Sequence, residues 1–466
     1  DVYKRQGKLN ANQAPDTQIS VEAINLFGDD RLNTIVRLSW YGADPDGYVV
    51  GYEISFDQQN WSYTTKQDST FKFSINSGSD TTDVDFYIRS IDNENLADPE
   101  PDYLKIPIKN TPPSISFDDK LTIPDTAFLV GTTSWSANDI DGIETITQVL
   151  LSINGNTWFE LNKSKKTFSL VPFDAISSDT TSAYLYYEGD QNPTNQRIEG
   201  LIVNDTNRLY IKAIDQAGTE SKIDTSNVFF LKGKKEDILV VGGIAGNART
   251  IYKNTLDNIM VNYDFLDMLA YNGLYRPKIW NITFRLQLEQ YDKLFFYSNE
   301  SLFNNDYSSL SAMLLEFAAA SLQGYANSGG KYLISTNFNH NQNIDGFVGV
   351  LPIASVSTKN YGSARLYQGD SIVSSLPNYP SLSSNLTLSG VGVYNIDSAD
   401  TEVIYEANVV DRRPTTPWTD TKIIASGRRV GGKFNQVYFG MQLWELYEKP
   451  ARLDSLFNQV LNVEFN

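Results

Sequence analysis

Two acidic turns are the first segments whose residue types suit a metal ion. Asp44-Pro45-Asp46-Gly47 places two carboxylates two positions apart, and Asp139-Ile140-Asp141-Gly142 repeats this arrangement. Carboxylate and backbone carbonyl oxygens are the ligands that Ca²⁺ prefers in proteins. The alternative is that Asp and Gly only shape a turn between strands, and no cofactor other than calcium is expected. The candidate calcium ligands are Asp44, Asp46, Asp139 and Asp141.

A second group of polar residues accompanies three apolar segments in the last part of the chain. Residues 238–241, 293–297 and 331–336 have the short apolar pattern of buried strands. In an open parallel sheet, the loops at the carboxyl ends of the strands form a crevice for ligands. We expect a small ligand to contact at least two of these three segments, the alternative being a merely solvated edge. The candidate ligand-binding residues are Gly242, Gly243, Ser298, Asn299, Glu300, Ser335, Thr336 and Asn337.

A tyrosine-rich stretch supplies a third candidate site. The interval from Trp158 to Tyr210 is 52 positions, against 26 from Trp61 to Tyr87, so roughly 26 residues are inserted. Exposed tyrosine rings beside Asp, Gln and Asn could stack on sugars and bind their hydroxyl groups. The alternative is an extra hairpin whose tyrosines pack on the last domain. The candidate carbohydrate-binding residues are Tyr184, Tyr186 and Tyr187.

Several kinds of catalysis are disfavoured by composition. The chain has no cysteine, which removes disulfides, thiolate nucleophiles and thiolate zinc sites together. Its single histidine, His340, lies five positions after Ser335, and no Gly-x-Ser-x-Gly is present, so a Ser–His hydrolase is disfavoured. Paired carboxylates such as Glu300 and Asp306 could serve a glycosidase only at a suitable separation in space.

The charge of the chain argues against nucleic-acid binding. There are 38 Lys and Arg against 56 Asp and Glu, which gives a formal charge of −18. Such a surface repels phosphate backbones. No apolar run approaches the ~20 residues that span a bilayer, so no transmembrane segment is expected in this chain.

An internal repeat organises the first half of the chain. Residues 40–47 recur at 135–142 as a shared Trp-x-x-x-Asp-x-Asp-Gly, and residues 87–92 recur at 210–215. The residues around these landmarks alternate between apolar and polar with the period of two that half-buried strands show. Short strands separated by Asp, Gly, Asn and Pro clusters predict two β-sandwiches.

These sandwiches resemble the fibronectin type III family. The resemblance rests on an early-strand tryptophan in Leu38-Ser39-Trp40 and a late-strand tyrosine in Phe86-Tyr87-Ile88-Arg89, and it covers roughly residues 14–232 in two copies. Other immunoglobulin-like topologies stay open. The resemblance implies spacer or binding modules rather than enzymes.

From residue 238 onward the pattern becomes strand, helix, strand, which predicts a mostly parallel sheet covered on both faces. This part looks like a divergent class I glutamine amidotransferase-like, or flavodoxin-like, domain. The active members of that family use a cysteine nucleophile with histidine and glutamate, and a chain without cysteine cannot supply this set. Amidotransferase activity is therefore not expected. The segments that carry the resemblance are 237–241, 291–296, 325–335 and 436–443.

The predicted fold class is two all-β sandwiches plus one α/β three-layer domain with a mostly parallel sheet. Asn110-Thr111-Pro112-Pro113 predicts a stiff connector, and the charged segment 232–237 predicts a flexible one. The predicted domains are a first sandwich at 14–110, a second at 111–233 and the α/β domain at 236–466, after an adaptor-like segment and linker at 1–13.

Residues 1–6 back-translate to a sequencing-library adaptor, so we expect the native start, with any signal peptide or lipid anchor, to be missing. The architecture favours a non-catalytic protein of the bacterial cell envelope, periplasmic or surface-exposed, with a lipoprotein among the open alternatives. Its expected partners are other envelope proteins or polysaccharide. The alternatives are a hydrolase with an unrecognised carboxylate or serine site in the last domain, and a carbohydrate-binding protein.

Overall fold

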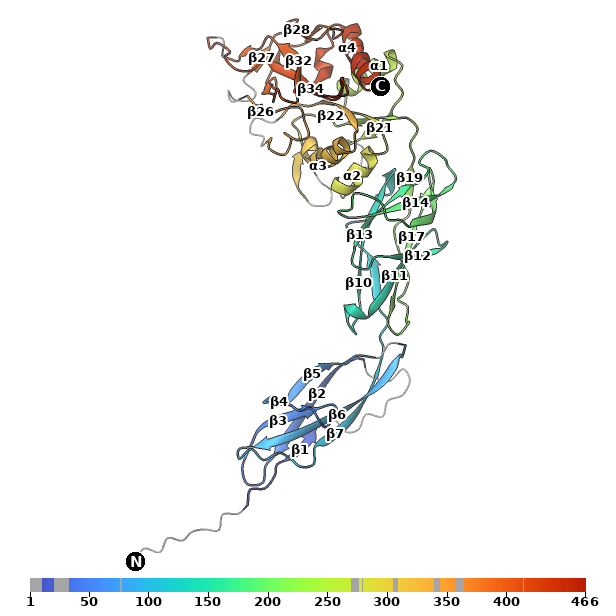
Figure 1. Cartoon of the computed structure of the whole chain (residues 1–466), viewed down its shortest axis with the longest axis vertical. Helices are drawn as coiled ribbons and strands as arrows, with labels where there is room; N and C mark the ends of the chain where they lie inside the picture. Colours follow the sequence, from blue (N-terminus) through green and yellow to red (C-terminus); the bar gives the residue numbers. More distant parts are fainter. Residues whose placement is uncertain are drawn as a thin grey trace, which may run out of the picture.

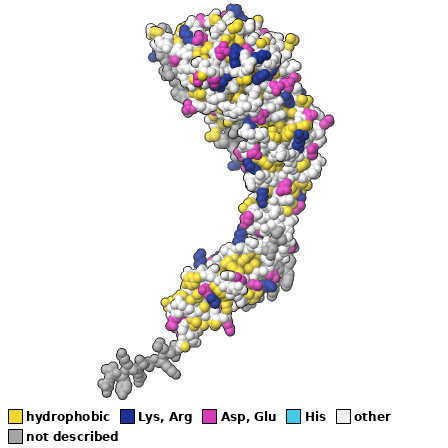
Figure 2. Space-filling model, viewed as in Figure 1, with side chains coloured by type: hydrophobic (Ala, Val, Ile, Leu, Met, Phe, Trp, Pro, Cys, Tyr) yellow, Lys and Arg dark blue, Asp and Glu magenta, His cyan; other side chains and the backbone are white. Residues whose placement is uncertain are grey.

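The computed structural model describes residues 11–20, 33–75, 78–269, 276–278, 280–304, 309–338, 344–357, 364–413 and 415–466. The chain is elongated, with strand-rich parts following one another along the long axis and the C-terminal part at one end (Figure 1). Acidic side chains lie along the whole visible face with basic ones among them (Figure 2). Among the described residues, no helix is long and apolar enough to cross a membrane.

The first strand-rich part is two facing sheets around one apolar core. Trp40 is at its centre, 2% exposed, and its indole Nε1 donates to the Lys66 carbonyl at 3.0 Å. Alternate residues of the strands point into the core, as the period of two predicts. One sheet has the order β1-β2-β5 (Asp16–Ile19, Ile35–Ala43, Asp68–Lys72), and the other β4-β3-β6-β7 (Ser62–Thr64, Val49–Ser55, Thr81–Asp92, Asp102–Lys109).

The second strand-rich part repeats this arrangement and enlarges it. Ile19 pairs with Trp40 in the first copy, and Phe117 pairs with Trp135 in the second, so the repeated tryptophans occupy equivalent positions. The inserted residues form a hairpin, β14 with β15, that widens one sheet. The sheet orders are β15-β14-β13-β10-β8 (Arg197–Ile202, Thr180–Tyr187, Thr167–Pro172, Gly131–Asn138, Ser114–Phe117), β12-β11-β17-β18 (Trp158–Leu161, Ile146–Ile153, Leu209–Asp215, Asp224–Thr225) and β16-β19-β9 (Thr206–Asn207, Phe229–Lys232, Thr126–Phe128).

The C-terminal part is built on a nine-stranded mixed sheet. The strands β21, β20, β22, β25 and β35 are parallel neighbours, and β35, β34, β32, β28 and β29 are antiparallel neighbours. In sheet order, the strands are Asp264–Asp267, Ile238–Gly242, Lys293–Tyr297, Lys331–Ser335, Lys433–Phe439, Ile423–Val430, Glu402–Ala407, Ser371–Val373 and Leu382–Ser383.

The predicted fold class is therefore wrong in its last component. Half of the neighbouring strand pairs in this sheet are antiparallel, and the described chain as a whole is mostly β-sheet with few helices. The physical cause is the two-residue turn Gly431-Gly432 between β34 and β35. Both glycines have positive φ, 62° and 85°, which is the backbone of a tight hairpin and forces antiparallel pairing.

Both faces of the parallel strands are buried. In β20, Leu239 and Val241 belong to one apolar cluster and Ile238 and Val240 to the cluster on the other face. The helices α2 (Trp280–Leu288) and α3 (Leu314–Asn327) contribute to the first cluster, and α1 (Asn247–Asn258) and α4 (Pro450–Asn458) to the second. Strands buried on both faces exclude polar side chains from their centres, so polar groups collect at the strand ends.

The helix α2 also joins the C-terminal part to the second sandwich. Gln287 Nε2 donates to the Phe128 carbonyl at 2.8 Å, and Thr283 Oγ1 donates to Thr132 Oγ1 at 2.7 Å. Arg285 donates to the Asp190 carbonyl at 3.0 Å, in the inserted hairpin region. Residues 128–130 of the sandwich lie inside the same apolar cluster as α2. This contact is shared core rather than a loose touch between surfaces.

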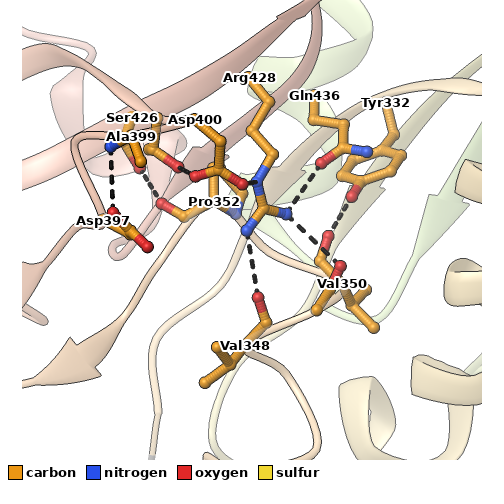
Figure 3. A network of polar contacts seen from close by, with 12 residues as sticks. Tyr332, Val348, Val350, Pro352, Asp397, Ala399, Asp400, Ser426, Arg428 and Gln436 are labelled. Carbon is orange, nitrogen blue, oxygen red and sulfur yellow. Dashed lines mark hydrogen bonds and ion pairs between the residues drawn. The ribbon is translucent and has the colours of Figure 1, made fainter.

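The segment after β25 is held across the sheet by Arg428 (Figure 3). Its guanidinium donates to the carbonyls of Val348 at 3.1 Å and Gly349 at 3.4 Å, and to Gln436 Oε1 at 3.2 Å. It also pairs with Asp400 at 3.0 Å. The Ser426 hydroxyl bonds to the Pro352 carbonyl at 2.5 Å, which fixes the same segment further along. Side chains of β34 thus fasten the segment that follows β25 to the sheet.

Arg428→Ala should destabilise the C-terminal part by about 2 kcal/mol, because two backbone carbonyls lose a charged donor. Hydrogen exchange should rise at residues 344–353, and calorimetry should show a lower transition temperature. The matched control is Arg413→Ala, whose side chain is 73% exposed beside Asp411 and should cost less than about 0.5 kcal/mol. Equal effects of the two variants would contradict this role of Arg428.

Candidate functional site

The candidate site lies where three parallel strands end side by side. Gly242, Tyr297 and Ser335 are register partners at the last positions of β20, β22 and β25. The backbone continues the pairing past them, since the N–H of Gly243 donates to the Tyr297 carbonyl at 2.8 Å. The N–H of Ser298 donates to the Ser335 carbonyl at 3.2 Å. The three predicted segments are therefore adjacent.

Five of the eight predicted residues form the closed floor of this edge. The Ser298 and Thr336 hydroxyls bond to each other at 2.9 Å, and Ser335 Oγ donates to the Met441 carbonyl at 2.9 Å. All three side chains are at most 1% exposed. A Cβ on Gly243 would stand 2.6 Å from a Leu314 methyl, so this glycine permits close packing. Gly242, the last residue of β20, is buried.

The other three residues, Asn299, Glu300 and Asn337, line a cavity of about 220 Å³. Its remaining walls come from residues outside the predicted ligand-binding set: Ile244, Leu388, Ser389, Gly390, Val391, Met441, Gln442, Trp444 and Glu445. Most of the missed polar groups follow β35, the fourth parallel strand. The signal for them was present, because the rule that parallel strands end at one edge also applies to this strand.

A chain of amides crosses the cavity. Asn337 Nδ2 donates to Glu300 Oε2 at 2.6 Å, and Gln442 Nε2 donates to Asn337 Oδ1 at 2.6 Å and to the Ser298 carbonyl at 2.6 Å. Gln442 is 6% exposed, and its Oε1 has no hydrogen-bond partner among the described residues. The same holds for Trp444 Nε1. Two residues that line the cavity thus each have a buried polar atom without a protein partner, which is costly.

Glu445 brings a second carboxyl group to the cavity. It lies in the short helix η4 (Leu443–Leu446), directly after β35. Burial raises the pKa of Glu445 to about 7, and the negative charge of Glu300 adds to the rise. Near neutral pH the Glu445 side chain is therefore partly protonated, so it can donate a hydrogen bond as the acid and accept one as the carboxylate. Proton transfer or binding of a hydroxyl or amino group is within its chemistry.

A nucleophilic serine site is not assembled in the described part of this edge. The hydroxyls of Ser298 and Ser335 are buried and engaged with Thr336 and with the backbone of Met441 and Leu443. His340, the base that a serine site would need, lies outside the described residues.

A wider hollow of about 790 Å³ opens at the opposite edge, around the first residues of the strands. The lysines that line it are engaged by the end of the chain. Lys331 Nζ donates to the Phe465 carbonyl at 2.6 Å, and Lys293 Nζ donates to Asn466 Oδ1 at 2.5 Å. These contacts close the sheet against the C-terminal segment. We therefore place the site at the carboxyl ends of the strands, in the smaller cavity.

The three tyrosines of the insertion lie away from this cavity. Tyr187 is 6% exposed in the sandwich core, and its hydroxyl accepts from the Asn162 N–H at 2.7 Å. Tyr184 and Tyr186 pack against the apolar cluster that contains α2. Burial raises the pKa of the Tyr186 hydroxyl. These contacts match the packing alternative, and the carbohydrate-binding role stays a prediction.

The aspartates of the two acidic turns accept hydrogen bonds from the protein. Asp139 accepts from the Asp141 N–H at 2.9 Å and from Thr145 Oγ1 at 2.7 Å. Asp141 accepts from the Thr111 N–H at 2.7 Å and from the Thr34 hydroxyl.

In the first copy, Asp44 accepts from the Asp46 N–H at 3.3 Å, and Asp46 accepts from the Gln13 N–H at 3.2 Å. Within the described ranges, no group of three or more Asp, Glu, His or Cys side chains could hold a metal ion. The calcium site stays a prediction.

Neither the known protein families nor the curated proteins contain a match to this chain. Parts of it are similar to solved structures. The fibronectin(III)-like modules of Clostridium thermocellum CbhA share 12% identity over 47% of this chain and 94% of theirs, with a TM-score of 0.17. A two-domain fibronectin type III segment of chicken tenascin shares 13% identity over 47% and 99%, with a TM-score of 0.21. PurLQS from Thermotoga maritima shares 12% identity over 49% and 99%, with a TM-score of 0.29. None of these similarities indicates an activity for this chain.

Glu445→Gln should remove a pH dependence from the stability of the C-terminal part. An acid whose pKa is raised from 4.5 to about 7 keeps its proton in the folded state after the unfolded state has lost it. Stability of the natural chain should therefore fall as pH rises from about 4.5 to about 7, by at most roughly 3 kcal/mol. Chemical denaturation at pH 5 and pH 8 measures this difference.

The control for this experiment is Glu448→Gln, an exposed carboxylate three positions away. It should keep the pH dependence of the natural chain. A Glu445→Gln variant that also keeps it would show that Glu445 titrates normally.

Removal of calcium should leave the first two sandwiches unchanged, because protein donors already occupy the oxygens of Asp139 and Asp141. The melting temperature in EDTA should equal that in millimolar CaCl₂. A fall of tens of degrees in EDTA, restored by calcium, would show that the acidic turns are metal sites.

Proposed function

We propose that this chain is a non-catalytic binding protein of the bacterial cell envelope. The division into modules at 14–110, 111–233 and 236–466 is part of this proposal. It is supported by the separate apolar cores of the two sandwiches and by the clusters on the two faces of the mixed sheet. The sandwiches act as an arm that presents the C-terminal module, in agreement with the extended shape (Figure 1). The partners are other envelope proteins or polysaccharide.

One observation carries the binding role of the C-terminal module. Gln442 and Trp444 both line the cavity at the strand ends, and each has a buried polar atom without a partner, the acceptor Gln442 Oε1 and the donor Trp444 Nε1. The carboxyls of Glu300 and Glu445 add acceptors, and the amides of Asn299 and Asn337 and the Ser389 hydroxyl supply both donors and acceptors. A small ligand that carries hydroxyl or amino groups supplies donors to these acceptors, and one ligand acceptor suffices for the indole. A volume of about 220 Å³ limits the ligand, or the part of it that enters, to a few ring or chain atoms.

A second candidate function is hydrolysis by a carboxylate pair. The observation that favours it is the raised pKa of Glu445 beside the charge of Glu300, since one protonated and one ionised carboxyl can act as acid and base. Against it, Glu300 is engaged by Asn337 rather than facing open space alone. Glutaminase or amidotransferase activity is not expected, because the chain has no cysteine.

The proposal predicts that Glu300→Ala and Asn337→Ala each weaken ligand binding at least tenfold, because each removes a member of the amide chain at the cavity. A panel of monosaccharides, amino sugars and amino acids, screened by thermal shift and measured by calorimetry, provides the ligand. Tyr186→Ala should leave binding unchanged, since its ring packs against the α2 cluster. The reverse pattern would move the site to the inserted hairpin.

The catalytic alternative is tested on the same variants. Turnover of aryl glycosides or aryl esters by the natural chain, abolished by Glu445→Gln and retained by Glu448→Gln, would replace the binding proposal with the hydrolase. Binding without turnover supports the proposal.

A further inference from the structure

The linker that enters the second sandwich is held by two aspartates. Asn110 Nδ2 donates to Asp215 Oδ2 at 2.5 Å, and the N–H of Thr111 donates to Asp141 Oδ2 at 2.7 Å. Asp141 belongs to the acidic turn and Asp215 ends β17, so both lie at the end of the sandwich that faces the preceding module. We call these contacts the linker clamp.

The same clamp is present in the first sandwich. Asn12 Nδ2 donates to Asp92 Oδ2 at 2.5 Å, and the N–H of Gln13 donates to Asp46 at 3.2 Å. Asp46 and Asp92 occupy the repeat positions of Asp141 and Asp215. The internal bonds repeat as well: Leu96 N–H donates to Asp92 at 2.8 Å, as Thr219 N–H does to Asp215. Each clamp begins with Asn-x-x-Pro in the sequence, at residues 12–15 and 110–113.

In the second sandwich, the clamp residues also hold the preceding sandwich. The Thr34 hydroxyl donates to Asp141 Oδ1, and Thr34 lies just before β2 of the first sandwich. Gln216, the neighbour of Asp215, donates from Nε2 to the Ile75 carbonyl at 2.9 Å. The N–H of Gly78 donates to the Gln216 carbonyl at 3.2 Å. The end that clamps the linker is thus also the surface on which a sandwich docks.

The equivalent surface of the first sandwich is exposed. Asp141 and Gly142 are buried and Gln216 is half-buried, whereas their counterparts Asp46, Gly47 and Asn93 are exposed. The next position, Tyr48 or Ile143, is exposed in both copies and stays outside the junction. Both copies of the repeat have the clamp. The three residues around it are more buried in the second copy, which a neighbouring sandwich covers, than in the first copy, which none covers in the described part of the chain.

We infer that this surface, formed by Asp46, Gly47 and Asn93 around the Asn12 linker, docks a further β-sandwich of the same type, joined on the N-terminal side of Asn12. Such a module would present a hydroxyl to Asp46, in the place of Thr34, and backbone groups to Asn93, in the places of Ile75 and Gly78. The arm is then a repeating array in which each junction has one fixed geometry. This inference is independent of the ligand proposed for the C-terminal module.

The junction between the two sandwiches of this chain is the reference for the test. Because the chain has no cysteine, spin labels can be placed at Gln59→Cys and Ser164→Cys without background. Electron–electron resonance should give one narrow distance distribution between the two sandwiches. Asn110→Ala should broaden it at least twofold, and Asn12→Ala should leave it unchanged.

The test uses an extended chain in which a second copy of residues 14–109 is fused directly before Asn12, and the rest of the chain follows unchanged. Asn12 then takes the place of Asn110 at the new junction. Labels at Gln59→Cys of both copies should give a distribution as narrow as that of the natural junction. Asn12→Ala and Asp46→Asn should each broaden it, and the fold should tolerate these changes because Asp46 is exposed and Asn12 is half-buried in a linker. Circular dichroism and calorimetry confirm that the added copy is folded. A broad distribution in the folded extended chain, or a narrow one that neither variant changes, overturns the inference.

Discussion

Burial of both faces of β20, β22, β25 and β35 is the constraint on which the C-terminal module depends. Side chains of alternate parity enter opposite apolar clusters, so the centres of β20, β22 and β25 have no room for polar groups, whereas β35 has Asn435 and Gln436 in its first half. Their parallel, in-register pairing then brings four chain segments to one edge at the same height. Polar residues excluded from the strands meet there. The cavity and its amides follow from packing rather than from any catalytic motif.

The same constraint explains which parts of the candidate site could be predicted from the sequence. Apolar runs that end in Ser, Asn and Glu predict segments that meet at one edge of the sheet, and Asn299, Glu300 and Asn337 line a cavity there. The sequence does not reveal that the Ser298 and Ser335 hydroxyls are consumed within the floor, because their partners are backbone and side-chain groups remote in sequence. The antiparallel half of the sheet was missed for a related reason. Several of its strands have two or three residues, too few for a period, and the Gly431-Gly432 turn was its clearest signal.

The arm depends on a different use of polar residues. Between the second sandwich and the C-terminal module, the contact is an apolar core bordered by hydrogen bonds, with the Phe128 and Tyr291 rings stacked and α2 placed across the sandwich. Between the two sandwiches, the contact is almost wholly polar, made of amides, hydroxyls and carboxylates. A polar junction fixes orientation by hydrogen-bond geometry while burying little area, whereas the apolar junction merges two folding units. The C-terminal module therefore shares a core with the second sandwich, whereas the first sandwich is joined to the second through the clamp and the hydrogen bonds of Thr34, Ile75 and Gly78.

The acidic turns show why one sequence pattern supports two interpretations. Two carboxylates spaced for Ca²⁺ are also spaced to receive N–H groups, and the ligands that decide between these fates lie elsewhere in the chain. For the turns, these donors are the N–H groups of Gln13 and Thr111, which reach Asp46 and Asp141. The neighbouring Asp92 and Asp215 receive the amides of Asn12 and Asn110 over 80 and 105 positions. The pKa of Asp92 shows the balance: burial opposes ionisation, yet the hydrogen bonds from Asn12 and from the backbone of Leu96 lower it. Neutral donors thus stabilise these carboxylates in the described structure, and the Asn-x-x-Pro before each sandwich is the sequence feature that accompanies the clamp.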